Sequence, residues 1–147
     1  MEKKFLTKTI QFLKIFSAIA LTIFLSTFVE IYWAMGSFSE RISSGNPDSS
    51  FFDDAYLISL FTTIILTFVF LLFAFIKNIY LKIAVEIISL ISVWFFWNYS
   101  IFVDRESSWS TYAFNEEIHY TISVSILPIL VLSIFTVLGL NYISKKL

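Results

Sequence analysis

Two carboxylic acids, Glu30 and Glu86, interrupt long apolar runs and are the first residues of this sequence that could do chemistry. Ionisable groups at membrane depth are costly, and they often mark ion or proton pathways. Glu30 lies five residues before Met35, the end of its run, which is roughly 7 Å at the rise of an α-helix. Glu86 lies a similar distance from the opposite boundary. The two acids are therefore too far apart for one carboxylate dyad, and a functional role would make them two separate stations on a proton or cation route.

A structural role is the alternative for both acids. Glu86 follows Lys82 by four residues, the spacing at which opposite charges pair on one helix face. Glu30 has no basic neighbour within its own run. The sequence leaves open whether either carboxyl is functional or structural.

His119 is the only histidine, and it stands beside Glu116 and Glu117. One histidine with two carboxylates is a conceivable metal site. Acidic residues are also favoured by the dipole at the start of a helix, and we prefer this reading of the pair. There is no cysteine, no His-Glu-x-x-His pattern and no glycine-rich phosphate loop. We expect no enzyme, no cofactor and no bound metal.

The composition indicates a membrane protein. Of the 147 residues, 58% are hydrophobic and only 14% are charged, against about 25% charged residues in an ordinary soluble domain. The net charge of −1 provides no basic field for nucleic acid. The elements that position the acids must therefore be stable in lipid.

Four apolar runs are each about as long as a membrane-crossing helix, which needs roughly 20 residues. They cover residues 16–35, 56–76, 83–102 and 120–140. Helices are expected because backbone groups find no water partner in lipid, and the runs lack the alternation of barrel strands. The triplet Ala18-Ile19-Ala20 resembles a signal cleavage site but lies too early in its run. We expect a single four-span domain in which the first run is retained.

The basic residues predict the orientation. All eight lysines flank one side of the spans: Lys3, Lys4, Lys8, Lys14, Lys77, Lys82, Lys145 and Lys146. The connections 36–55 and 103–119 hold only two basic residues, Arg41 and Arg105, with eight acids. Basic residues stay on the cytoplasmic side of membranes. We expect both termini in the cytoplasm and both long loops outside. The small size and the Phe- and Ile-rich, Lys-biased composition lead us to expect a bacterial inner membrane as the location.

Small and polar side chains should hold the helices together, because apolar faces gain little from one another in lipid. Each run has such a face. Examples are Ser26 with Glu30, Ser59 with Thr67, Ser89 with Ser100, and Thr121 with Ser125. The prediction is an all-α, antiparallel four-helix bundle. Asn98-Tyr99-Ser100 matches a glycosylation pattern, but it lies inside a span and is set aside.

The leading functional hypothesis is non-enzymatic interaction within the membrane, protective or as an accessory subunit. The layout is similar to that of immunity proteins against pore-forming bacteriocins; the resemblance covers topology alone and transfers no residues. Beyond the bilayer, the expected partner is a membrane protein or a second copy. Expected contact residues are two tryptophans and outer polar residues: Trp94, Trp97, Asp53, Asp54, Glu116, Glu117 and His119. The alternative is a small proton- or cation-coupled transporter or channel that uses Glu30 and Glu86.

Overall fold

Four long helices make up the chain in a computed structural model that describes residues 2–146, with side chains at 7, 9–143 and 145. They are α1 (Glu2–Met35), α2 (Phe51–Phe73), α3 (Ile79–Arg105) and α4 (Phe114–Lys146). Two short 3-10 helices, η1 (Gly36–Phe38) and η2 (Ser107–Trp109), follow α1 and α3. No strand occurs within residues 2–146. The predicted all-α class is confirmed, and each long helix is long and apolar enough to cross a membrane.

The helix bounds differ from the apolar runs that predicted them. Helices α1, α3 and α4 extend beyond their runs, whereas α2 begins before residue 56 and ends at Phe73, before residue 76. The second helix starts at Phe51, inside the expected loop 36–55, because Ser50 caps it. The Ser50 hydroxyl accepts from the Asp53 backbone at 3.1 Å, and the Asp53 carboxylate accepts from the Ser50 backbone at 3.2 Å. This reciprocal capping box satisfies two free N–H groups. Hydropathy locates the part of a helix that suits lipid, but caps decide where the helix begins.

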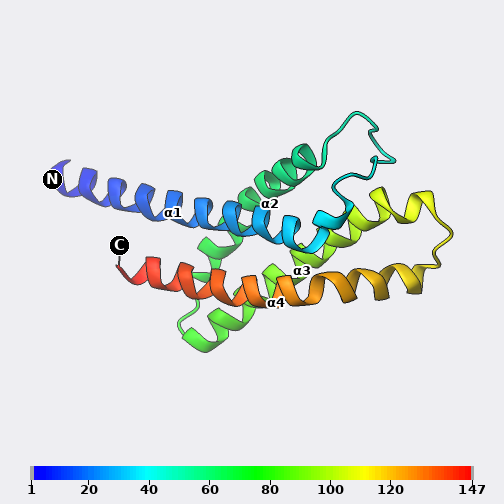
Figure 1. The fold of residues 1–147 in the computed structure, drawn as a ribbon. Helices are drawn as coiled ribbons and strands as arrows, with labels where there is room; N and C mark the ends of the chain where they lie inside the picture. The colour runs from blue at the N-terminus through cyan, green and yellow to red at the C-terminus, as the bar shows by residue number, and fades with distance from the viewer. Residues whose placement is uncertain (1, 147) are drawn as a thin grey trace.

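The helices run antiparallel in chain order, and both termini lie at the same end of the bundle (Figure 1). We call this the terminal end; the α2–α3 turn also lies there. The connections after α1 and α3 meet at the opposite end, the loop end. Most contacts between helices join α1 to α2, α1 to α4, and α3 to α4. By contrast, few contacts join α2 to α3 or α1 to α3.

Two apolar clusters form the core. The terminal-side cluster comprises Ile19, Ile23, Leu66, Phe70, Leu90, Trp94, Ile129, Val137 and Leu140. The loop-side cluster comprises Ile31, Ala34, Met35, Phe38, Phe51, Ala55, Ile101 and Phe102. Along each of the first three helices, buried polar residues stand between these two sets. This polar layer contains Thr27, Glu30, Ser59, Thr62 and Asn98, to which α4 adds Ser125.

The polar faces predicted from sequence are partly correct. Ser59, Thr67, Thr121 and Ser125 are buried as expected. On α1, however, Thr27 is buried whereas Ser26 is only half-buried, and Ser100 on α3 is exposed. Pro128 is buried inside α4, which continues across it.

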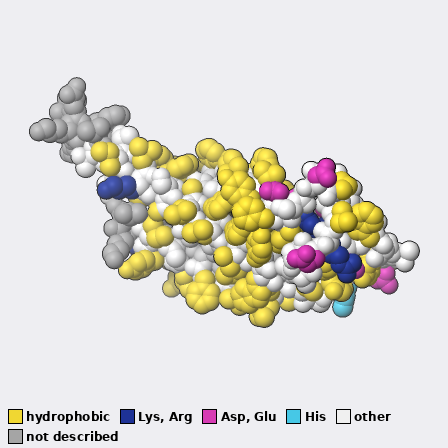
Figure 2. Space-filling view, turned by 45° about the horizontal axis from the view of Figure 1, so that its top comes forward, with side chains coloured by type: hydrophobic (Ala, Val, Ile, Leu, Met, Phe, Trp, Pro, Cys, Tyr) yellow, Lys and Arg dark blue, Asp and Glu magenta, His cyan; other side chains and the backbone are white. Residues whose placement is uncertain are grey.

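Large apolar side chains cover the outside of the bundle between its two ends. In Figure 2 they form a continuous belt on the visible face, while acidic side chains gather towards the loop end. Examples from three helices are Leu21, Phe61 and Leu127, each more than half exposed. A surface of this kind suits a lipid environment and not water.

Candidate polar site inside the bundle

The Glu30 carboxyl is held by an amide from another helix. Asn98 Nδ2 on α3 donates to Glu30 Oε1 on α1 at 2.7 Å. Both side chains have no exposed surface. Glu30 is thus fully buried in the bundle interior, on the terminal side of the loop-side cluster.

One turn closer to the terminal end, a second hydrogen bond joins the same two helices. Trp94 Nε1 donates to Thr27 Oγ1 at 3.0 Å, again between fully buried side chains. Because 27 and 30, and 94 and 98, lie one helical turn apart, the two bonds share one interface. They fix the register of α1 against α3.

Two oxygen atoms of this site have no partner. Glu30 Oε2 and Asn98 Oδ1 are buried and accept no hydrogen bond from the described residues. Buried polar atoms are nearly always hydrogen-bonded, so such an exception asks for an explanation. Glu30 is thus a buried acid with one unpartnered carboxyl oxygen, bound to an amide whose oxygen is also unpartnered.

A second acid–amide contact lies near the terminal end. Asn141 Nδ2 on α4 donates to Glu86 Oε2 on α3 at 2.8 Å. Lys82 Nζ lies 3.6 Å from Glu86 Oε1 and donates to Asn141 Oδ1 at 3.1 Å. The i, i+4 pairing expected from sequence is therefore confirmed, and Asn141 extends it across to α4.

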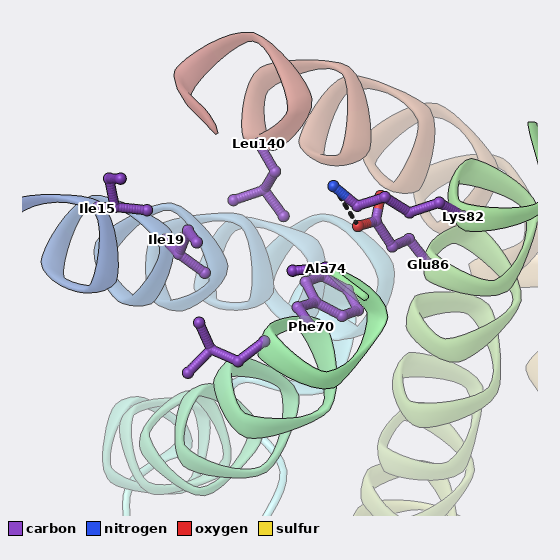
Figure 3. A pocket seen from close by; sticks show the side chains of 8 residues that line it. Ile15, Ile19, Phe70, Ala74, Lys82, Glu86 and Leu140 are labelled. Carbon is purple, nitrogen blue, oxygen red and sulfur yellow. Dashed lines mark ion pairs between the residues drawn. The ribbon is translucent and has the colours of Figure 1, made fainter. Parts of the chain in front are cut away.

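This cluster borders a cavity of about 170 Å³. In Figure 3, Lys82 and Glu86 reach from α3 towards the space between the other helices. Apolar residues form the rest of the wall, among them Ile15, Phe70 and Leu140. The cavity is large enough for several water molecules.

The two acids belong to separate sites, as predicted. Residues 86 and 98 of α3 are twelve positions apart, roughly 18 Å along a helix axis. Leu90 and Trp94, both fully buried, fill the interval. A proton or ion passing between the two sites must cross the terminal-side cluster.

The acids proposed as outer contacts have structural partners. Asp54 forms an ion pair with Arg105, which is buried and also donates to the Arg41 carbonyl. Asp53 completes the cap of α2. Glu116 accepts from the Ala113 backbone at 2.8 Å at the start of α4.

Glu117 joins two elements of the loop end. It accepts hydrogen bonds from Tyr99, at 2.8 Å, and from Ser107. His119 is exposed and borders a shallow pocket with Tyr112 and Glu116. Within the described residues, no three His, Cys, Asp or Glu side chains gather as a metal site.

The two tryptophans proposed as contacts differ in position. Trp94 is fully buried in the terminal-side cluster, and its indole N–H donates to Thr27. The prediction that Trp94 contacts a partner at the outer face is therefore wrong. Trp97 lines a groove between α2 and α3, near the loop end. The groove has a volume of about 280 Å³, and its other walls are Asp54, Leu57, Ile58, Phe61, Ser100, Ile101 and Asp104.

Sequence reasoning missed Asn98 and Asn141, the amides that hold the two acids. The available signal was the presence of an amide within or at the edge of an apolar run, since such a group needs a partner on another helix. No protein-family model, curated protein or solved structure matches this chain.

Proposed function

We propose that this chain is a multi-pass protein of a bacterial cytoplasmic membrane with both termini in the cytoplasm. The support is the distribution of charge. All eight lysines belong to segments at the terminal end, while residues 36–55 and 103–119, at the loop end, carry two arginines and eight acids. This bias follows the positive-inside rule.

We further propose that the protein acts without catalysis, by binding a transmembrane helix of another protein in the groove between α2 and α3. The observation that carries this proposal is the groove between these two helices, which make few contacts with each other and leave apolar side chains exposed along it. Phe61 and Leu57 are about half exposed there, although both belong to the wall of a groove.

The chemistry of the groove defines its partner. Ser100 is small and exposed, which allows close approach of a helix backbone. Asp54 and Asp104 stand at the loop-end rim, where Arg105, which pairs with Asp54, is the one basic side chain in contact among the described residues. The expected partner helix therefore has an apolar face and a basic residue at its outer end. A pore-forming toxin helix, as in the immunity-type hypothesis, fits this description.

Site-specific photo-crosslinking in intact cells tests the groove. A photoreactive phenylalanine analogue is placed at Phe61 or Trp97, and at Phe135 on α4 as the matched control. Phe61 is 55% and Phe135 is 68% exposed, so both face the bilayer to a similar degree. Adducts with a second, identified membrane protein from the groove positions alone are expected. Equal adducts from Phe135, or adducts with a second copy of this chain, would contradict the proposal.

A functional test applies where a pore-forming toxin is encoded beside this chain. Expression should protect cells, and Trp97→Ala should reduce the protection while Phe135→Ala leaves it unchanged. Equal protection by both variants would remove the groove from the mechanism.

Proton- or cation-coupled transport is the second candidate. The observation that favours it is the presence of two acids in the bundle interior, each hydrogen-bonded to an amide of another helix. Reconstituted vesicles should then show a proton or cation flux that both Glu30→Gln and Glu86→Gln abolish. A flux that survives both substitutions, or no flux in the wild type, would exclude this function.

A further inference from the structure

The interior of the bundle contains the same acid–amide arrangement twice. In each case an asparagine Nδ2 donates to one carboxyl oxygen across a helix interface: Asn98 to Glu30 at 2.7 Å, and Asn141 to Glu86 at 2.8 Å. Both acids are buried. The two sites differ in what joins their remaining oxygen atoms.

At Glu86 a cation joins them. Lys82 Nζ lies 3.6 Å from Glu86 Oε1 and 3.1 Å from Asn141 Oδ1. The ammonium thus contacts the second carboxyl oxygen and the amide oxygen together, and it balances the carboxylate charge. Every oxygen of this acid–amide pair has a partner.

At Glu30 the corresponding oxygens are Glu30 Oε2 and Asn98 Oδ1, and neither has a hydrogen-bond partner among the described residues. The ion pairs formed by the described side chains are Arg41–Glu106, Lys82–Glu86 and Arg105–Asp54, so none reaches Glu30. Apolar clusters lie on both sides of the pair. An ionised Glu30 would be a buried charge with one hydrogen bond, which is strongly unfavourable.

We propose that Glu30 binds one proton on Oε2 and shares it with Asn98 Oδ1. A protonated carboxyl gains one O–H donor and keeps an acceptor oxygen. One proton therefore serves both unpartnered oxygens, closes a ring of two reciprocal hydrogen bonds and removes the buried charge. At Glu30 the proton joins the remaining carboxyl and amide oxygens and removes the charge, as the Lys82 ammonium joins the corresponding oxygens and balances the charge at Glu86.

A proton suits this pair better than a metal cation. Hard cations need several oxygen ligands, whereas a proton needs only Oε2 and Oδ1. The buried hydroxyls of Thr62 and Thr121 also lack a hydrogen-bond partner among the described residues, and the described hydrogen bonds join neither of them to Glu30. This inference concerns only a proton bound at Glu30. Its test is therefore independent of whether a partner helix binds in the α2–α3 groove.

Infrared spectroscopy of the protein in lipid vesicles at neutral pH tests the proposal. The wild type should show the C=O band of a carboxylic acid, which shifts in heavy water. Glu30→Gln should remove this band, and the control Glu86→Gln should leave it. Asn98→Leu should retain the band at higher frequency, because the carbonyl loses its hydrogen bond.

Two infrared results would overturn the proposal. The first is that Glu30→Gln removes only carboxylate bands and leaves the carboxylic-acid band unchanged. The second is a carboxylate band whose frequency changes with sodium concentration. If Glu30→Gln does not fold, the proposal is tested on the Glu86→Gln protein with carbon-13 at its glutamate carboxyls, by the infrared bands of the labelled groups. A labelled carboxylic-acid band supports the proton, and its absence refutes it.

Discussion

Asn98 donates to Glu30 at 2.7 Å across an interface that is otherwise sparse. α1 packs mainly on α2 and α4, and its contact with α3 is short. The Asn98–Glu30 and Trp94–Thr27 hydrogen bonds both fall within that short contact. These two hydrogen bonds, together with the two apolar clusters that α1 and α3 share, therefore define how the helices meet.

Replacing Asn98 with leucine should destabilise the bundle. The change removes the amide that Glu30 Oε1 accepts from and leaves that carboxyl without a partner. Interhelical hydrogen bonds in membranes contribute about 0.5–2 kcal/mol, and we expect a loss in this range. Reversible unfolding in mixed micelles measures it.

The double variant Glu30→Leu/Asn98→Leu is the control for this loss. Replacing both partners by apolar groups removes the unsatisfied acid, so stability should return towards the wild type. If the double variant loses as much unfolding free energy as the two single variants together, Glu30 and Asn98 are not energetically coupled.

Trp94→Phe should lower the unfolding free energy by roughly 1–2 kcal/mol, since it removes a buried hydrogen bond to Thr27 and part of a packed ring. Trp97→Phe is the matched change in a half-buried indole that lines the groove. It should change stability by less than about 0.5 kcal/mol. The same unfolding assay compares them, and equal losses would argue against a special role for the Trp94 bond.

Arg105→Ala should destabilise the loop end by roughly 3 kcal/mol, because it leaves Asp54 without its ion pair and the Arg41 carbonyl without its donor. Arg105 also lies over the Phe51 ring, 5.3 Å from its centre. The control is Arg41→Ala, which breaks a surface pair with Glu106 at 2.8 Å and should cost at most about 1 kcal/mol. Protease sensitivity of the loops, measured beside unfolding, locates the effect; a larger loss for Arg41→Ala would reverse this ranking.

Lys82→Met should reduce stability by roughly 1–3 kcal/mol, since Glu86 Oε1 and Asn141 Oδ1 both lose their contact with the ammonium. Lys77→Met changes an exposed lysine in the neighbouring turn and should be nearly neutral. Adding Glu86→Gln to Lys82→Met should recover part of the loss. No recovery would mean that the lysine acts through packing and not through the carboxylate.

The four helices could be predicted because their apolar runs have the length that a bilayer demands. The polar faces followed from the same pattern, and Ser59, Thr121 and Ser125 are indeed buried. The ends of the helices were predicted less accurately than the existence of the helices. The start of α2 depends on the Ser50–Asp53 capping box, which is a local hydrogen-bond pattern and not a hydropathy signal.

The partners of the two acids were not predicted in full. Lys82 was found because it lies on the same helix as Glu86, at a spacing that sequence reveals. Asn98 lies 68 residues from Glu30 in the chain, and Asn141 lies 55 residues from Glu86. Such pairs depend on how helices pack, which the periodicity of a single helix does not specify.

Four membrane crossings, with the loop end outside the cell, are the central claim, and cysteine accessibility tests them most directly. The chain has no native cysteine, so Asn46→Cys, Ser110→Cys, Lys77→Cys and Lys145→Cys each give a single reporter. In intact spheroplasts, a membrane-impermeant maleimide should label positions 46 and 110 at once and positions 77 and 145 only after lysis. Labelling of 77 or 145 before lysis, or protection of 46 and 110, would contradict the account.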